Sequence, residues 1–164
     1  FLNLIKGLDQ RNIEVHLKVL SNTTNKSVMG YLKKNQLGHL NHQVLFLSRD
    51  ELSNAIGKFH ILGFALKKSF PLIASMPTKI AESLACGTPI ICNNFNSDIE
   101  EMITENKIGI LHDFSLPLTE AKYLEIINLI NDRSTLEVCS NFPKNHFSLL
   151  TGVTKYQEIY NYIK

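Results

Sequence analysis

The chain has 164 residues, of which 44% are hydrophobic and 20% charged, and its formal net charge is +2. This length suits one domain with a substantial core, and the composition is that of an ordinary globular protein rather than a disordered one. The longest basic runs are lysine pairs at 33–34 and 67–68, so an extended nucleic-acid or anionic-membrane surface is not indicated. No apolar run approaches the roughly 20 residues of a membrane span, and no signal peptide is predicted.

Helical and extended patterns alternate through the first part of the chain. Leucines and isoleucines at helical spacing predict a helix over residues 1–12, and apolar residues at every second position predict a strand over 13–21. The pattern then predicts a helix over 25–40, a short buried strand over 43–48, a helix over 49–59 and a strand over 60–66.

The second part continues the alternation and ends in helix. A helix over 77–86 is closed by Gly87, and a second over 97–106 opens with Ser97 or Asp98 as its cap, while strands are predicted over 89–93 and 108–113. Short apolar strands alternating with helices predict one α/β domain with a parallel sheet and helices on both faces. From Leu118 onward the chain is predicted to be helical, with an inward face made by Leu118, Ala121, Leu124, Ile127 and Ile130.

Cysteines and histidines form no pattern typical of a metal site or a disulfide framework. The three cysteines, Cys86, Cys92 and Cys139, include no CxxC pair, so we expect reduced, mostly buried thiols in a cytosolic protein. The six histidines are scattered without an HExxH motif, so no metal site is expected. His112 ends a predicted strand and could reach a crevice there, although a turn histidine is the simpler interpretation.

The segment SMPTKIAESLACGTPIICN, residues 75–93, places three notable residues where a helix is predicted to begin. Pro77 falls in the first turn, where its missing N–H is not needed. Free backbone N–H groups and the positive end of the helix dipole make such an end a site for anions, and for phosphate above all. Lys79 adds a full positive charge, and Glu82 lies on the same face because it follows three residues later. Since a carboxylate would repel phosphate, Glu82 is better suited to ribose hydroxyls, and the set indicates a nucleoside diphosphate.

A second interpretation of Lys79 and Glu82 is an exposed ion pair. Oppositely charged residues three apart on a helix often pair, which stabilises the helix by a few tenths of a kcal/mol. Pro77 and Gly87 would then only start and end the helix, and spacing alone leaves both interpretations open.

Residues 70–114 resemble the donor-binding segment of the glycosyltransferases with the GT-B fold called family 4, or group 1. They are similar in particular to a bacterial subgroup with the signature S-x-P-T-K-x-x-E-x-L-A-C-G-x-P-x-I. The ending, residues 146–163, resembles the terminal helix of the same family, which reads FSW...YxxIY.

The resemblance implies the C-terminal, Rossmann-like half of a GT-B fold, which holds a nucleotide-sugar donor. In that family the helix amides and Lys79 approach the diphosphate, Glu82 accepts from the ribose, and the two residues before Pro77 line the sugar. Lys79 and Glu82 are therefore the expected catalytic residues. The implied donor-binding residues are Ser75, Met76, Pro77, Thr78, Lys79 and Glu82.

The implied activity is retaining transfer of a hexosyl group from a UDP- or GDP-sugar to a glycan or lipid-linked acceptor, in bacterial polysaccharide biosynthesis. No essential metal or other cofactor and no nucleic-acid partner is expected. The expected location is the cytoplasm, with the inner face of the membrane as a peripheral site for the full-length protein. Residues 1–164 would be a single C-terminal domain, inactive alone, whose acceptor binds through a missing N-terminal domain.

The sequence departs from the wider family at two places. Ala74 stands where most members carry a glutamate that contacts the donor sugar. The strand and glycine-rich loop with which the family's C-terminal domain begins are also absent before Phe1. The alternatives are a non-catalytic fragment that binds nucleotide and a nucleotide-sugar 2-epimerase of the same fold.

Overall fold

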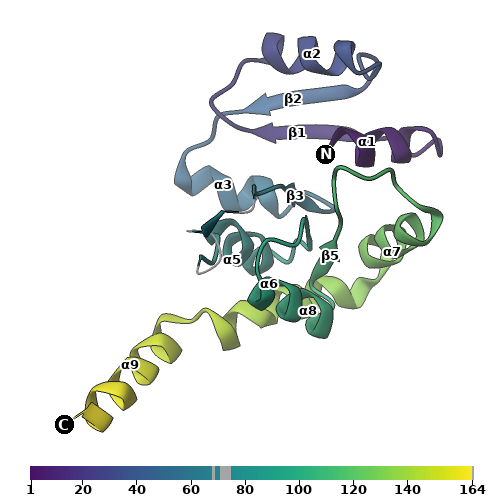
Figure 1. Ribbon diagram of the computed structural model, residues 1–164. Helices are drawn as coiled ribbons and strands as arrows, with labels where there is room; N and C mark the ends of the chain where they lie inside the picture. The colour runs from purple at the N-terminus through teal and green to yellow at the C-terminus, as the bar shows by residue number, and fades with distance from the viewer. Residues whose placement is uncertain (68, 71–74, 164) are drawn as a thin grey trace.

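The computed structural model describes residues 1–67, 69–70 and 75–163, in which helices and strands alternate along the chain (Figure 1). The first elements are α1 (Leu2–Asp9), β1 (His16–Leu20), α2 (Asn25–Lys34), β2 (Asn41–Leu45), α3 (Arg49–Ile56) and β3 (Leu62–Phe64). The later elements are α5 (Thr78–Ala85), β4 (Ile90–Cys92), α6 (Ser97–Asn106), β5 (Gly109–Leu111), α7 (Glu120–Asn131), α8 (Arg133–His146) and α9 (Leu149–Ile163).

All strand pairs are parallel, and helices cover both faces of the sheet formed by β3, β4 and β5. Ile90 and Cys92 of β4 face a core shared with α5, α6 and α8, whereas Ile91 faces a core shared with α1 and α7. This alternation follows from the two-residue period of a strand. The predicted α/β class, with a parallel sheet and helices on both faces, is confirmed.

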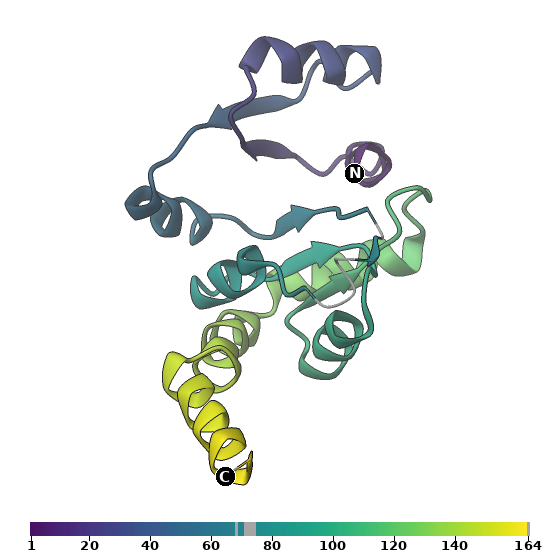
Figure 2. The ribbon, with the colours of Figure 1, turned by 60° about the vertical axis from the view of Figure 1, so that its left-hand side comes forward.

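The strands form two sheets rather than the single sheet that the sequence predicts. β1 pairs with β2 from His16 opposite Asn41 to Leu20 opposite Leu45, and β3, β4 and β5 form the other sheet in that order. No hydrogen bond joins β1 to β3 in the described part of the chain. Figure 2 shows the β1–β2 layer standing apart from the β3–β5 layer. The alternating pattern predicts strands but not which strands pair, and this explains the error.

Helix α1 connects the two layers through neighbouring side chains. Leu4 packs into the core beneath β4 and β5, with Ile91 and Ile110. Ile5 packs the other way, into the core of the β1–β2 layer. Both side chains are 5% exposed, so this short helix is buried against both halves of the molecule.

Several local predictions need correction. The predicted helix over 25–40 ends at Lys34, because Gln36 takes a left-handed backbone conformation with φ of 64°. Strand β2 begins two residues earlier than predicted and stops at Leu45, which leaves Phe46 exposed.

The C-terminal region forms three helices, and its inward face differs from the prediction. Ile126 is buried in α7, whereas Leu124, predicted to face inward, is 50% exposed. Helix α9 has no buried residue and projects away from the body of the molecule (Figure 1). None of the helices in the described ranges is both long and apolar enough to cross a membrane.

Candidate functional site

Helix α5 begins one residue later than the sequence predicts. Pro77 is its N-cap, with φ of −64° and ψ of 127°, and Thr78 is the first helical residue. A proline cannot cap a helix with its side chain, and no side-chain cap is present. The carbonyl of Pro77 accepts a hydrogen bond from the N–H of Ile80 at 3.0 Å, which closes the first turn.

Two backbone donors at this helix end have no partner among the residues that the structure describes. Neither the N–H of Thr78 nor that of Lys79 has an acceptor within the described ranges. Unsatisfied amides at a helix N-terminus carry the partial positive charge of the helix dipole and attract anions. Among the described residues, the start of α5 therefore presents donors without acceptors, as an anion site requires.

Lys79 and Glu82 lie on the same face of α5, and both side chains are exposed. Both line a cavity of about 1430 Å³ that is also bordered by α1, β1, α2 and β3. No salt bridge joins Lys79 to Glu82 in the described part of the chain, so the ion-pair interpretation is not supported by their geometry. Both charges are available to a ligand at this wall of the cavity.

Two asparagines fix the loops around α5, and the sequence did not reveal their roles. Asn96 donates from Nδ2 to the carbonyl of Ser75 at 3.1 Å, while its Oδ1 accepts from the N–H of Ile99 at 2.8 Å. Asn96, rather than Ser97 or Asp98, is thus the cap of α6. Asn93 makes two 2.8 Å bonds with the backbone of Leu66, which hold the extension of β3 against that of β4. The only signal in the sequence was that Asn93 ends a predicted strand.

The other predicted donor-binding residues do not line the cavity. Ser75 and Pro77 are half-buried, Thr78 is exposed, and Met76 is 41% exposed. Of the predicted set, the cavity lining includes Lys79 and Glu82 alone. Ala74 lies outside the described residues.

The C-terminal end of α5 is rigidly fixed. Gly87 has φ of +76°, and its N–H donates to the carbonyl of Leu84 at 2.8 Å, which confirms that this glycine ends the helix. Buried Ser83 donates from Oγ to the carbonyl of Thr88 at 2.8 Å, and Thr88 donates to the carbonyl of Ile56 at the same distance. These bonds fix the helix whose other end carries the free donors.

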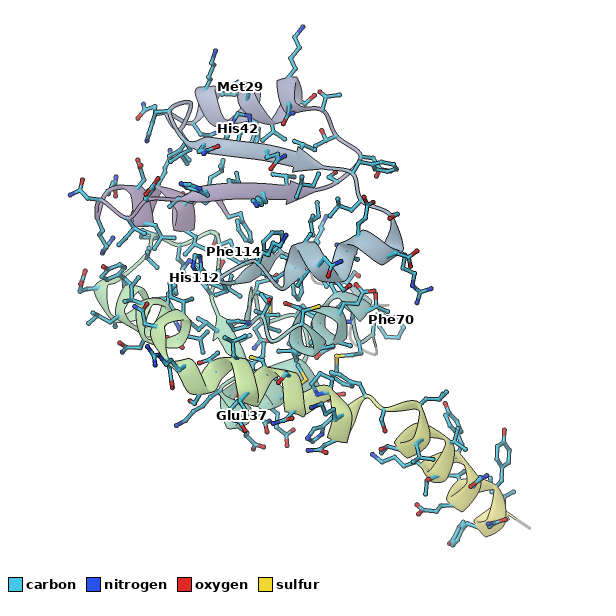
Figure 3. All side chains as sticks on the ribbon, turned by 180° about the vertical axis from the view of Figure 1, so that it is seen from behind. Met29, His42, Phe70, His112, Phe114 and Glu137 are labelled. Carbon is cyan, nitrogen blue, oxygen red and sulfur yellow. The ribbon has the colours of Figure 1, made fainter. Side chains whose placement is uncertain are left out.

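His112 follows β5 and is 8% exposed, so it is a buried residue rather than a turn histidine. Its ring is nearly perpendicular to that of Phe114, with 5.5 Å between the centroids. Figure 3 labels both residues. Its Nε2 has no hydrogen-bond partner among the residues described. Burial lowers the pKa of His112 below its ordinary value, and the nearby Lys122 lowers it further, so the ring is neutral at pH 7.

The three cysteines are free, as the sequence predicts. Burial raises the pKa of both Cys92 and Cys139 to about 12, so these thiols are protonated at neutral pH. Over the described ranges, no group of three or more His, Cys, Asp or Glu side chains is arranged to hold a metal ion.

A family model described as "Glycosyl transferases group 1" matches residues 1–146, which is most of the chain. The chain belongs to the group 1 glycosyltransferases. The match includes α5 with Lys79 and Glu82 and ends at His146, the last residue of α8. Searches of curated proteins and of solved structures gave no match.

Membership confirms the broad family that the sequence resembles. A group 1 glycosyltransferase is a transferase, and the family in general implies a nucleotide-sugar donor and a glycan acceptor.

Proposed function

We propose that this domain binds the nucleoside diphosphate of a UDP- or GDP-hexose at the start of α5, for retaining transfer to a glycan or lipid-linked acceptor. The free amides of Thr78 and Lys79 and the ammonium group of Lys79 contact the diphosphate. Glu82 accepts from the ribose hydroxyls, and Ser75 and Met76 lie towards the sugar. The protein would be a member of the bacterial S-x-P-T-K subgroup, active as part of an enzyme that also carries an acceptor domain.

The observation that carries the proposal is the absence of partners at this helix end. Lys79 and Glu82 are three residues apart, yet they form no ion pair in the described part of the chain, and both line the large cavity. The amides of Thr78 and Lys79, at the start of the same helix, have no acceptor among the described residues. A diphosphate satisfies the amides and the lysine, and a ribose satisfies the carboxylate.

The proposed chemistry depends on where charge develops during glycosyl transfer. Glycosyl transfer passes through an oxocarbenium-like state while negative charge builds on the departing diphosphate. Donors that already point at the leaving group stabilise this charge without reorganising. Lys79 and the helix end supply such donors, so we propose leaving-group stabilisation by the protein itself, with no essential metal.

Calorimetric titration of the 164-residue chain with UDP, GDP, UMP and GMP tests the proposal. We expect one diphosphate to bind at a single site, and its monophosphate to bind more weakly. Lys79→Ala should weaken diphosphate binding by about tenfold or more, since a hydrogen bond to a charged group contributes about 1.5–3 kcal/mol.

Lys155→Ala is the matched control, because Lys155 is an exposed lysine on α9, outside the cavity lining. Its affinity for nucleotide should equal that of the unaltered chain. An equal loss of diphosphate affinity in the two variants would reflect net charge alone and would contradict a site at Lys79. Unaltered affinity in Lys79→Ala would contradict it as well.

A further inference from the structure

The charged residues of the chain are unevenly distributed along the sequence. Residues 15–49, which run from just before β1 to the first residue of α3, contain five of the 17 lysines and arginines and none of the 15 acidic residues. The rest of the chain therefore has 12 basic and 15 acidic residues, a formal net charge of −3, although the whole chain has +2. The layer formed by β1, β2 and α2 is thus the positive part of the molecule.

Three of the five basic residues lie together on one face of α2. Lys26, Lys33 and Lys34 fall within an arc of about 100°, because a helix has about 3.6 residues per turn, and all three are exposed. Gly30 lies between them on the same arc, and a Cβ added there would meet nothing within 4 Å. We call these three lysines the basic face of α2. Figure 1 shows α2 on the outside of the β1–β2 layer, away from the sheet of β3, β4 and β5.

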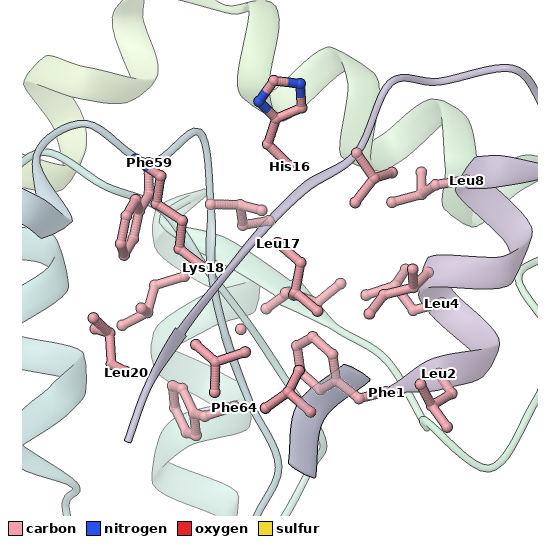
Figure 4. A pocket seen from close by; sticks show the side chains of 18 of the residues that line it. Phe1, Leu2, Leu4, Leu8, His16, Leu17, Lys18, Leu20, Phe59 and Phe64 are labelled. Atoms are coloured by element: carbon pink, nitrogen blue, oxygen red, sulfur yellow. The ribbon is translucent and has the colours of Figure 1, made fainter. Parts of the chain in front are cut away.

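The basic face is separate from the large cavity. Lys18 of β1 borders that cavity, as Figure 4 shows, and Tyr31 of α2 borders it as well. None of the three lysines of the basic face lines it. Leu32, on the opposite side of α2, packs into the core of the β1–β2 layer, so the basic face points away from that core.

No acidic side chain offsets the charge of the basic face. In the described part of the chain, none of its lysines forms a salt bridge. Lys33 and Lys34 lie in the last turn of α2, where the helix dipole favours a cation. Lys26 lies in the first turn, where the dipole disfavours a cation, and this turn has no acidic residue. The stability of the helix therefore does not account for the whole pattern.

We propose that the basic face of α2 binds an anionic lipid surface. Lysine ammonium groups are compact charges on flexible stems, which suits a mobile layer of headgroup phosphates. Basic residues clustered on a helix are attracted to anionic lipids within about a Debye length. The sequence shows only the lysine pair at 33–34, and the helix brings Lys26 onto the same face. The contact needs no nucleotide, so it does not depend on the donor site proposed at α5.

Nucleic acid is a less suitable partner for this face. Its recognition relies largely on arginine forks and on aromatic rings that stack on bases. The basic face has no arginine, and the ring of Tyr31 lies towards the cavity. A lipid surface needs only the positive charge that the face presents.

Binding of the 164-residue chain to lipid vesicles tests this inference, and Gly30 provides the sharpest variant. Gly30→Lys places a fourth ammonium group at the centre of the basic face, and Gly30→Ala is the matched control, because both substitutions favour the helix over glycine. Vesicles of phosphatidylcholine alone are compared with vesicles that also contain phosphatidylglycerol. We expect Gly30→Lys to bind the anionic vesicles about fivefold more tightly than Gly30→Ala. The unaltered chain should bind them measurably, and less as salt is raised.

Removal of the charges gives the converse test. Replacing all three lysines of the basic face by glutamine should weaken binding to anionic vesicles on the order of a hundredfold. The matched control replaces three exposed lysines elsewhere, Lys107, Lys144 and Lys155, by glutamine and should bind nearly as the unaltered chain does. Circular dichroism checks that both variants are folded.

Three results would overturn the proposal. The first is equal binding of the unaltered chain to neutral and anionic vesicles, or binding to neither. The second is equal affinity of Gly30→Lys and Gly30→Ala, or equal losses in the two glutamine variants, since net charge alone would then act. The third is binding to a duplex oligonucleotide that requires the basic face, without binding to anionic vesicles.

Discussion

Lys79 and Glu82 owe their availability to their neighbours in the chain. Pro77 offers no side-chain cap to the helix, and the amides of Thr78 and Lys79 have no acceptor among the described residues. The three-residue spacing places both charged side chains on one face, and the structure leaves both on the cavity wall. One short segment thus provides donors, a cation and an acceptor.

Glu82 can be tested separately from Lys79 through the part of the nucleotide that it is proposed to contact. Glu82→Gln should weaken binding of the diphosphate several-fold, since hydrogen bonds to a charged acceptor are stronger than those to a neutral one. The same substitution should have little effect on the 2′,3′-dideoxy nucleotide, which has no ribose hydroxyls to donate. Calorimetry on both proteins with both nucleotides measures the coupling between Glu82 and the ribose hydroxyls directly. Equal losses with both nucleotides would exclude a ribose contact by Glu82.

At the scale of elements, α5 is fixed at its C-terminal end so that its N-terminal end can stay open. Gly87 ends the helix in a left-handed conformation, and Ser83 and Thr88 secure the following turn to its surroundings. Asn96 secures the loop before the helix through the carbonyl of Ser75. The donors at the start of α5 therefore belong to an element with little freedom to shift.

Gly87→Ala should destabilise the protein by about 1–3 kcal/mol, because a non-glycine residue is strained at positive φ. The added Cβ would also lie 2.7 Å from Leu136 Cδ2. Gly152→Ala is the matched control, since a Cβ there would meet nothing within 4 Å in helix α9. Urea denaturation of both variants gives the comparison. A Gly87→Ala protein as stable as Gly152→Ala would show that this turn does not constrain the helix.

Only some features of the helices and loops around the candidate site could be predicted from the sequence. The placement of Lys79 and Glu82 on one face of a helix that Gly87 ends was predictable, because helix spacing and helix-ending glycines are local properties. Asn96 was not, because its bond to Ser75 spans 21 residues and depends on two loops meeting at one edge of the sheet. The inward face of α7 was mistaken because apolar residues occur on several sides of this helix, and only packing against α1 and β5 selects Ile126.

At the scale of the whole molecule, the two layers differ in how well they are buried. The three residues of β4, Ile90–Cys92, are at most 1% exposed, whereas the strands of the β1–β2 layer are only partly covered. Helix α1 joins the layers, but β1 and β3 do not pair in the described chain. Strand pairing of this kind depends on contacts between distant segments, which the sequence pattern does not specify.

Native-state hydrogen exchange should reflect this difference. Amides of β4 should exchange only on global unfolding, whereas those of β1 and β2 should exchange about tenfold faster or more, through local opening of their layer. Amides of the buried α5 residues Ile80, Ser83 and Leu84 serve as the reference within the better-packed half. Equal protection of β1 and β4 would mean that the layers open together as one cooperative unit.

The proposed location of the donor is tested most directly by titrating the ¹⁵N-labelled chain with UDP and with GDP and following each backbone amide by NMR. We expect the largest chemical-shift changes at the amides of Thr78 and Lys79, with little change in α9. Saturable binding that leaves these two amides unmoved while others shift would contradict a nucleotide site at the start of α5.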